Sequence, residues 1–520
     1  MTLFKLQKKL VFIVDSNRIY SSSIPVVLTI FLVLAMHIAA YPFNSVVIYP
    51  FQNQLTDKKL YWLPRGFAQT IANSIDCPDD YILKSDDVSD LYEQIGLAPN
   101  MELTYATLIK MCQLNNIQYA LFGTMKNADN NIKIDAKIFI AKTSTSVPIA
   151  IEGNLNNILA LQNQIVKAIV DFLNAHGIKA FQQNDVFKDI SPYSFEMYIK
   201  AQQEEKNETK IKFLKQALKE DKSFSSANIA LAQVSYEMED YENAIQHLAN
   251  IPSTSSLYPK ALFYVANIHA LKNDYSNALT SYLEASKYQR SSSLFNNIAA
   301  ILIRQDDLEH AQWYMEQALS IIPADNDLIF NHAILSLQSK EYKKAKEYLI
   351  SYLNKHPENL PGYLMLEFLS RKENNESSAS IILDIAHNYK DFAGAKEKFS
   401  DDIKKYLIYQ YNLEEELLTK YEIARNKSID DNNAAALRSY KERAKENMKY
   451  KEYKQSLDDL FKASLKSPFD WELYYLIGKI YYLTNDIKNA EKYLAFSLWC
   501  KENPESSQLL SEMKSNPAKP

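Results

Sequence analysis

Glycine is scarce in this sequence, with only 8 among 520 residues. No two of these glycines stand within a few residues of each other. Phosphate-binding loops, dinucleotide fingerprints and the sharp turn under a nucleophilic serine each need closely spaced glycines, because their backbone must turn tightly and approach the ligand. The sequence therefore excludes these three kinds of site.

Cysteine is also sparse, and histidine is scattered. Cys77, Cys112 and Cys500 form an odd set that cannot build a disulfide framework, although the sequence leaves a Cys77–Cys112 bridge open. Cys112 lies in the apolar run 106–114, which predicts a core position. None of the 8 histidines is paired at the spacing of a helical zinc site. We expect no metal and no cofactor.

Charge of one sign does not dominate, since the formal net charge is −5. The lysines of residues 441–454 are interleaved with glutamates, as on a solvated helix face, so the sequence predicts no nucleic-acid binding. The carboxylate cluster Glu414-Glu415-Glu416 has no partner pattern for acid–base chemistry. We expect that the protein is not an enzyme.

One long apolar run stands near the N-terminus. Residues 24–40 carry no Asp, Glu, Lys or Arg, and as a helix they come close to the ~30 Å hydrocarbon core of a membrane. The basic residues before this run are Lys5, Lys8, Lys9 and Arg18. Because basic flanks stay in the cytosol, the sequence predicts a cytosolic tail over 1–23 and an exported remainder. A cleaved signal peptide is the alternative, since Ala39 and Ala40 end the run.

Small residues recur along the C-terminal two thirds of the chain at intervals of 33 or 34 residues, with one longer gap. This column is Ala244, Ala278, Ala311, Ala345, Ala379, Ser456 and Ala490. A second small column stands twelve positions earlier, at Ala232, Ala266, Ala299, Ala333, Ala444 and Gly478. A column of large residues stands three positions before the first, at Tyr241, Tyr275, Leu308, Tyr342 and Tyr453. Three columns in register indicate a repeated architecture.

This pattern resembles the tetratricopeptide repeat, in which two antiparallel helices bury their apolar faces by stacking on neighbouring repeats. Pro323, Pro357 and Pro468 fit as residues that close a repeat, because proline cannot continue a helix. We expect the solenoid over residues 192–510, with a degenerate repeat and an insertion near 413–433 filling the longer gap. Residues beyond this solenoid, 511–520, are expected to form a disordered tail.

The inner surface of such a solenoid is lined by the first helix of each repeat, and it suits an extended peptide or a partner helix. We predict that the partner-binding residues are Tyr236, Phe263, Asn267, Asn296, Phe330 and Tyr475. Chaperone-binding members of this family hold the terminal carboxylate of a peptide with a clamp of lysine and asparagine residues, so we compared the corresponding positions of this sequence. Ile229, Gln233 and Phe263 stand at those positions here, so we expect protein binding without that clamp.

Residues 41–178 show a different periodicity, typical of a small α/β domain. Apolar residues alternate strictly over 132–140, which places them on one face of a strand. The expected strands lie at 46–51, 81–84, 119–126, 132–140 and 148–152, and the expected helices at 62–75, 105–114 and 158–172.

Short motifs in this region resemble the amino-terminal domain of the TolB type, over about residues 45–176. They are Pro50-Phe51-Gln52-Asn53, Gly66-Phe67, Gly123 and Ala160-Leu161-Gln162. The resemblance implies the fold. Acidic residues often stand beside the first glycine of that family, but this sequence has Pro64-Arg65-Gly66, so we predict no binding site in that loop.

The sequence as a whole predicts an α+β chain that is mostly α. A membrane anchor over 24–40 leads to a TolB-like α/β domain and then to a helical solenoid of tetratricopeptide repeats. We expect an extracytoplasmic scaffold for protein–protein interaction in the bacterial inner membrane, or a periplasmic one if residues 24–40 are cleaved. The alternative function is a sensory or regulatory subunit of an envelope signalling system that acts with a separate cytosolic effector.

Overall fold

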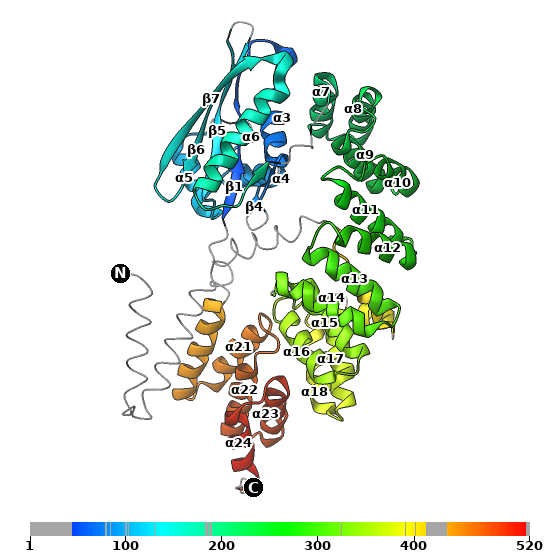
Figure 1. The fold of residues 1–520 in the computed structure, drawn as a ribbon. Coiled ribbons are helices and arrows are strands. Elements are labelled where there is room, and N and C mark those ends of the chain that lie inside the picture. Colours follow the sequence, from blue (N-terminus) through cyan, green and yellow to red (C-terminus); the bar gives the residue numbers. More distant parts are fainter. Residues whose placement is uncertain are drawn as a thin grey trace, which may run out of the picture.

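The computed structural model of the chain has a mixed α/β region followed by a long helical array from Pro192 onwards (Figure 1). It describes residues 44–515 except 78–80, 84, 99–100, 102, 129–130, 183–186, 188–189, 324, 390–391, 401 and 412–433. The predicted cytosolic tail, the apolar segment 24–40 and the insertion near 413–433 all lie outside the described residues. None of the described helices has the length and apolar character needed to cross a membrane.

The α/β region is built on one mixed sheet. Its strands are β1 (Ser45–Ile48), β2 (Gln52–Gln54), β4 (Tyr81–Ile82), β5 (Tyr119–Ala128), β6 (Asn131–Ile140) and β7 (Thr145–Asn154). Their order is β4-β1-β5-β6-β7, with β2 also paired to β5. Strand β1 runs parallel to β4 and β5, whereas β5, β6 and β7 form an antiparallel meander in which Ile134 pairs with both Met125 and Ile151. A separate pair joins β3 (Ile75–Asp76) to β8 (Phe181–Gln182).

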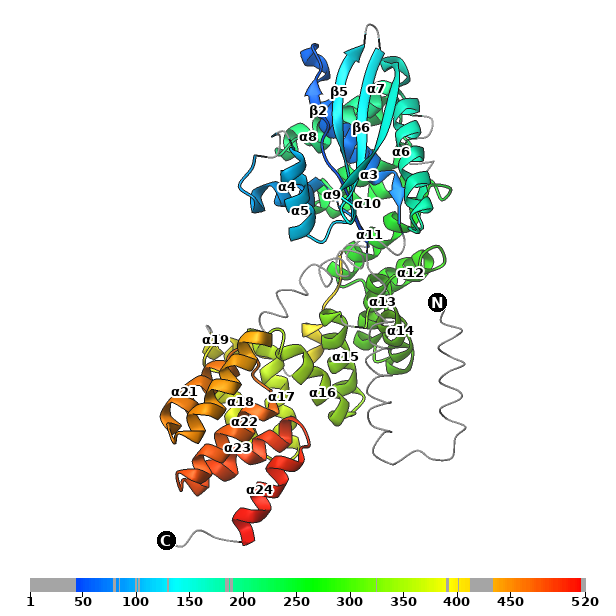
Figure 2. The same ribbon diagram turned by 90° about the vertical axis from the view of Figure 1, so that its left-hand side faces the viewer.

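Both faces of the sheet are covered by helices, so this region has three layers (Figure 2). Helices α3 (Leu63–Asn73) and α6 (Ile158–Ala175) pack on the face that carries Ile132, Ile134 and Ile138 of β6. Helices α4 (Ser85–Gln94) and α5 (Tyr105–Leu114) cover the other face. The predicted alternation of β6 is confirmed, while α4, β2, β3 and β8 were not predicted. No disulfide joins Cys77 to Cys112, and Cys112 is buried as predicted.

The helical array consists of antiparallel helix pairs. They are α7 (Pro192–Gln202) with α8 (Asn207–Glu220), α9 (Ser225–Glu237) with α10 (Tyr241–Ala249), α11 (Tyr258–Leu271) with α12 (Tyr275–Ser286), α13 (Ser292–Arg304) with α14 (Leu308–Ile321), α15 (Asn326–Gln338) with α16 (Tyr342–Leu353), α17 (Leu360–Lys372) with α18 (Glu376–Ala386), a helix over 434–449 with α21 (Tyr453–Ser464), and α22 (Trp471–Leu483) with α23 (Ile487–Cys500). Between α18 and the helix over 434–449 lie α19 (Phe392–Lys398) and the short 3-10 helix η3 (Ile403–Tyr406).

The small-residue columns are helix-packing positions, as predicted. Every member of the column from Ala244 to Ala490 is fully buried. In the last pair, a Cβ atom on Gly478 of α22 would lie 2.7 Å from the Leu494 side chain of α23, so only glycine allows this approach. Small side chains therefore set the distance between the two helices of each pair.

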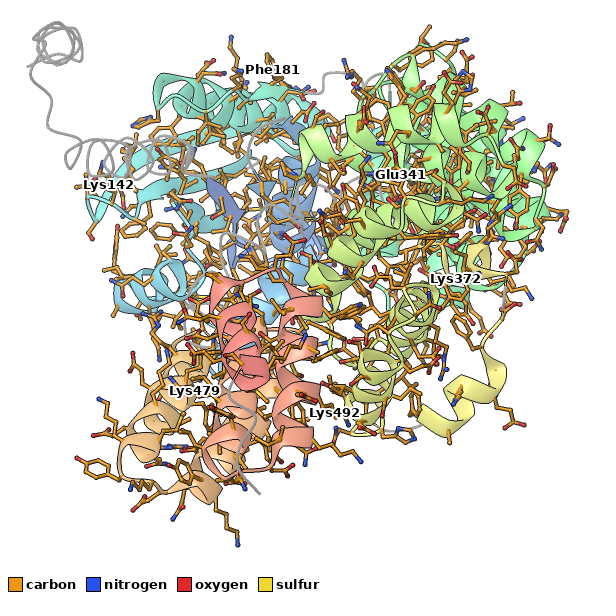
Figure 3. The ribbon with its side chains drawn as sticks, turned by 90° about the horizontal axis from the view of Figure 1, so that it is seen from below. Lys142, Phe181, Glu341, Lys372, Lys479 and Lys492 are labelled. Atoms are coloured by element: carbon orange, nitrogen blue, oxygen red, sulfur yellow. The ribbon has the colours of Figure 1, made fainter. Side chains whose placement is uncertain are left out.

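The turn between the two helices of a pair is repeated along the array. In every pair from α9–α10 onwards, the turn contains one non-glycine residue with a φ of 56° to 65°, namely Glu239, Asn273, Asp306, Lys340, Asn374, Lys451 and Asn485. The residue that follows occupies the N-cap position of the second helix, and in four of the turns an aspartate there accepts a main-chain hydrogen bond. Glu341, labelled in Figure 3, occupies this position before α16. The large-residue column provides the first residue of these second helices.

The α/β region and the array share one apolar core. Buried residues of α7 to α9, such as Phe195 and Leu214, belong to the same cluster as the inner faces of α3 and α6. A Cβ atom on Gly66 of α3 would lie 1.9 Å from Ile199 Cγ2 of α7, so α3 and α7 are in close contact at this point. Gln203 Nε2 donates to the carbonyl oxygen of Trp62 at 2.8 Å beside it.

The last helix pair packs back on the middle of the array. Helix α23 contacts α18, and Trp499 Nε1 donates to Glu373 Oε2 at 2.6 Å. Lys492, labelled in Figure 3, lies 3.6 Å from Asp384. Helix α24 (Pro504–Ser515) then covers α23 and buries Met513. This helix corrects the predicted tail over 511–520, because its apolar contacts order the chain as far as Ser515.

Candidate functional site

Four buried asparagines line the inner side of three neighbouring repeats. Asn267 lies on α11, Asn296 and Asn297 on α13, and Asn331 on α15, and each is at most 1% exposed. A buried carboxamide is costly unless its donors and acceptors are paired. The partners of these four side chains therefore define what this surface binds.

A distant segment of the same chain supplies most of these partners. We call residues Leu407–Tyr411, which follow η3 and have no regular secondary structure, the strap. Asn331 forms two hydrogen bonds with the strap main chain, from Nδ2 to the Ile408 carbonyl oxygen at 2.7 Å and from the Ile408 amide to Oδ1 at 2.8 Å. Asn297 does the same for Gln410, at 2.6 Å and 2.8 Å. The strap is thus held through its backbone.

The spacing of these two pairs matches the period of an extended chain. Asn297 and Asn331 occupy the same position in successive repeats, since each stands two residues before its small-column alanine. Ile408 and Gln410 are two residues apart, the spacing at which an extended chain presents equivalent main-chain groups to one side. One repeat of the array therefore corresponds to two residues of an extended peptide.

The other two asparagines complete a connected network. Asn296 Nδ2 donates to the Ile408 carbonyl oxygen at 3.0 Å, and Asn267 Nδ2 donates to the Tyr411 carbonyl oxygen at 3.2 Å. The Tyr282 hydroxyl donates to Asn267 Oδ1 and accepts from Asn297 Nδ2 at 3.0 Å. Burial raises the pKa of Tyr282 well above its usual value, so the hydroxyl keeps its proton. The network connects the carboxamides to one another and to the Tyr282 hydroxyl.

Two side chains of the strap form hydrogen bonds with the charged residues Arg304 and Asp325. Arg304 Nε donates to the Tyr409 hydroxyl at 2.8 Å, and its guanidinium lies over the rings of both Tyr409 and Tyr275. Burial raises the pKa of Tyr409 to about 12, although Arg304 opposes the shift. Gln410 Nε2 donates to Asp325 Oδ2 at 3.1 Å. These contacts add side-chain selectivity to backbone recognition.

The residues before the strap fasten it to the array. Lys404 of η3 forms an ion pair with Asp306 in the turn before α14. The ring of Tyr406 stacks on Phe399, with ring centroids 5.3 Å apart, and its hydroxyl accepts from the Ser400 amide at 2.9 Å. Leu407 is buried in the main core of the array. The N-terminal side of the strap is therefore anchored independently of the asparagines.

The residues predicted to bind a partner occupy three kinds of position. Asn267 and Asn296 contact the strap, and Tyr236 lies near enough to Tyr411 for that phenol to help raise its pKa, a shift caused mainly by burial. Phe263 and Phe330 are instead buried in the core against Tyr282 and Tyr352. Tyr475 lies half-buried on α22, outside the strap contacts.

Sequence reasoning missed Asn297 and Asn331, each of which makes two hydrogen bonds with the main chain of the strap. They stand one position after Asn296 and Phe330, which were predicted. The signal available was the recurrence of asparagine at one repeat interval on helices that are otherwise apolar. A polar residue repeated in register on a buried face has to have a partner.

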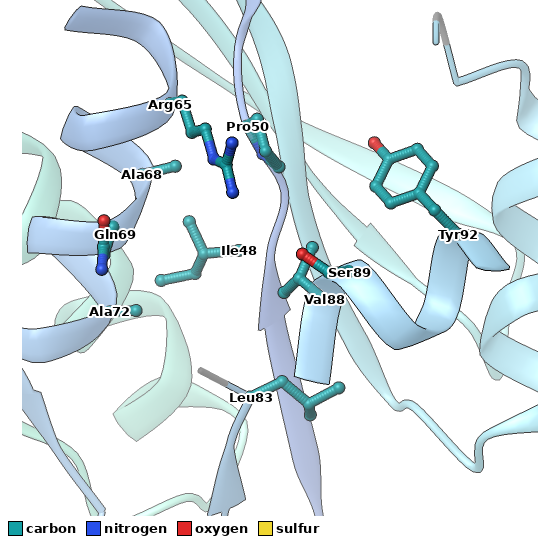
Figure 4. Close-up of a pocket in the computed structure, with 10 residues that line it drawn as sticks. All are labelled: Ile48, Pro50, Arg65, Ala68, Gln69, Ala72, Leu83, Val88, Ser89 and Tyr92. Carbon is teal, nitrogen blue, oxygen red and sulfur yellow. The ribbon is translucent and has the colours of Figure 1, made fainter. Parts of the chain in front are cut away.

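A separate hollow lies between α3 and α4 in the α/β region (Figure 4). Arg65 and Gln69 from α3 and Ser89 and Tyr92 from α4 supply its polar groups, and the rest of its lining is apolar. Among the described residues that line it there is no Asp, Glu, His or Cys to ligate a metal. Within the described part of the chain, no cluster of three such residues could hold a metal ion.

Comparison with known proteins identifies the repeats. The family model for the tetratricopeptide repeat matches residues 292–325, which include α13 and α14, and residues 472–495, which cover most of α22 and part of α23. The chain thus contains tetratricopeptide repeats, and its helical array is a repeat scaffold of the kind that binds other proteins. A search of curated proteins found no match.

Solved structures similar to the array share little sequence with it. YrrB, described as a TPR protein with an unusual peptide-binding site, is 16% identical, with 36% of this chain and 98% of that chain covered at a TM-score of 0.32. PilF from Pseudomonas aeruginosa is 19% identical, with 38% and 87% covered at a TM-score of 0.31. The C-terminal part of a TPR repeat-containing protein from Cytophaga hutchinsonii is 14% identical, with 61% and 97% covered at 0.30.

Proposed function

We propose that this chain, whose array consists of tetratricopeptide repeats, is a membrane-anchored scaffold that binds an extended segment of a partner protein outside the cytoplasm. The binding site is the groove formed by α11, α13 and α15. The observation that carries the proposal is the pair of two-hydrogen-bond contacts that Asn297 and Asn331 make with main-chain groups two residues apart. Because every extended peptide presents such groups at this spacing, the groove is suited to peptide backbone.

The proposed location rests on the sequence. Residues 24–40 form an apolar run after a basic segment, which favours a single-pass anchor in the bacterial inner membrane with the repeats in the periplasm. Cleavage after this run would leave a periplasmic protein. Alkaline phosphatase fused after Pro520 is expected to be active in either case, and an inactive fusion would place the repeats in the cytosol.

The α/β region is proposed to be a TolB-like domain that positions the groove relative to the membrane. Its sheet order and its two helical layers are compatible with that resemblance. The contact of α3 with α7 at Gly66 and Ile199 joins it firmly to the first repeat. The groove would then keep a fixed distance and direction from the anchor.

The same junction favours a second candidate function, a sensory or regulatory subunit. A shared core between the α/β region and the array would transmit a change in one part to the other. In that case the chain would act with a separate cytosolic effector through its anchor. Co-purification of such an effector only while the groove is occupied would favour this candidate over a passive scaffold.

Photo-crosslinking in intact cells tests the main proposal. A benzophenone amino acid replacing Tyr236, which lies near Tyr411, is expected to capture a partner protein. The same amino acid replacing Tyr450, which is 71% exposed and outside the groove, is the matched control. Capture at position 236 should be lost when Asn297→Ala and Asn331→Ala are added. Capture that is unchanged by these two substitutions would contradict binding in the groove.

A further inference from the structure

We propose that the strap is an internal ligand that closes the groove, and that the partner displaces it with an extended segment carrying a basic residue where the strap carries Gln410. This inference rests on the proposed function of the groove and specifies its regulation and the chemistry of its ligand.

The strap is bound as a peptide ligand would be bound. Its main-chain groups at Ile408 and Gln410 have their partners on two different helices, and it makes no regular secondary structure of its own. Tyr411 is 42% exposed, and Ile408 and Tyr409 are half-buried. Because the asparagines contact backbone atoms, any extended segment can replace these hydrogen bonds one for one.

The attachment of the strap to the array makes it a strong competitor even if its contacts are weak. A tethered segment acts at a high effective concentration, and a free peptide binds only the fraction of molecules whose groove is open. The ion pair of Lys404 with Asp306 and the stacking of Tyr406 on Phe399 hold the strap close to the groove. A partner therefore needs at least one contact better than the strap provides.

Gln410 is the position at which the strap is a poor ligand. Its Nε2 atom donates to Asp325, but its Oε1 atom is buried without a hydrogen-bond partner. Asp325 also caps α15 through Oδ1, which accepts from the amides of Asp327 and Leu328, so Oδ2 is left to face the ligand. Burial and the charge of Asp325 raise the pKa of Asp327 beside it, against the opposing effects of Gln410 and His356.

A lysine or arginine at this position would be a better ligand than Gln410. Its side chain carries donors and no acceptor, so no side-chain oxygen would be buried without a hydrogen bond, and its positive charge is attracted to Asp325 and Asp327. The residue before this basic residue is expected to be a tyrosine, because the hydroxyl and the ring of Tyr409 both contact Arg304. The partner segment is thus expected to read aliphatic residue, tyrosine, then a basic residue.

Two synthetic peptides test this inference on the full chain in detergent. One is the strap sequence Lys-Tyr-Leu-Ile-Tyr-Gln-Tyr, residues 405–411, and the other differs only by lysine in place of the glutamine. The second is expected to bind about tenfold more tightly, because an ion pair with Asp325 replaces a hydrogen bond from an uncharged amide. The double substitution Tyr409→Ala and Gln410→Ala weakens the strap and is expected to increase the affinity of both peptides at least about tenfold.

Controls separate this inference from the proposed function. Tyr450→Ala with Gln508→Ala removes the same residue types from exposed positions and should leave peptide affinity unchanged. Adding Asn297→Ala and Asn331→Ala to the weakened strap should abolish binding. Equal affinity for the wild-type and weakened chains would overturn the internal ligand while leaving the groove's function intact. Failure of both peptides to bind the weakened chain would overturn the proposed function itself.

Hydrogen exchange provides a second measurement that needs no variant. A saturating concentration of the lysine peptide is expected to accelerate hydrogen exchange at the amides of Ile408 and Gln410. These amides lose their hydrogen bonds to Asn331 and Asn297 when the strap leaves the groove. Amides within α13 should be unaffected. If the peptide binds without accelerating exchange at these two amides, displacement is wrong. This result decides the question even if the weakened variant does not fold.

Discussion

Replacing Asn331 by alanine should release the strap without unfolding the array. The substitution removes two hydrogen bonds to Ile408, of 2.7 Å and 2.8 Å, and one of 2.8 Å to Asn296 Oδ1. Only the two bonds to Ile408 hold the strap, and at about 1 kcal/mol net for each, the strap loses roughly 2 kcal/mol of local stability. Since every 1.4 kcal/mol is tenfold in an equilibrium constant, the opening equilibrium should rise about 30-fold.

Hydrogen exchange at the Ile408 amide measures this opening equilibrium directly. Asn388→Ala is the matched control, because Asn388 is an exposed asparagine at the end of α18 whose Nδ2 also makes two hydrogen bonds, both to main-chain carbonyls. Its removal should leave Ile408 unchanged. The reasoning is refuted if Asn331→Ala lowers protection equally throughout α13 and α15, since Asn331 would then stabilise the helices and not the strap.

The remaining predictions concern the packing and charge of the array. Gly66→Ala should separate the α/β region from the first repeat at a cost of about 1–3 kcal/mol, seen as two calorimetric transitions in place of one. Ala311→Leu should overpack the α13–α14 contact and lower the free energy of unfolding by a similar amount, which urea unfolding measures. Lys340→Gly should stabilise by about 0.5–1 kcal/mol, because lysine has a φ of 60° there; no rise in melting temperature would contradict this. Burial lowers the pKa of His332 to about 4, below the ordinary 6.5, so the unfolded chain binds the proton first and stability falls as the pH drops below 6.5. The loss should reach about 2 kcal/mol at pH 5 and be absent in His332→Gln, which urea unfolding at both pH values would show.

The helical array was largely predictable because its signal is local and repeated. Ala299 and Ala311 sit where two helices of one repeat meet, and the same geometry recurs at each period, so the columns appear in a single sequence. The alternation of β6 was visible for a similar reason, since every second residue faces α3 and α6. Helix α4 was missed because its sequence, Ser85–Gln94, is short and largely polar, and its apolar face consists of only Val88, Leu91 and Tyr92.

The strap could not be predicted in the same way. Its contacts join residues that are 77 and 113 positions apart, and no periodicity relates Ile408 to Asn331 or Gln410 to Asn297. Asn267 and Asn296 were predicted only from their places on the first helix of a repeat. Their ligand became apparent only when the fold brought the two segments together. Phe263 and Phe330 were predicted from equivalent helix positions, and in the structure large neighbours, Tyr282 and Tyr352, bury them.

The junction at Gly66 also limits how this protein can be divided. A solenoid needs something to shield the apolar side of its first helix pair, and most repeat proteins use an extra polar-faced helix for this purpose. Here the task falls to the α/β region, which covers Phe195 and Leu214. An excised fragment beginning at Ser191 would expose these side chains to water and tend to aggregate. The smallest soluble unit that contains the groove therefore includes the sheet.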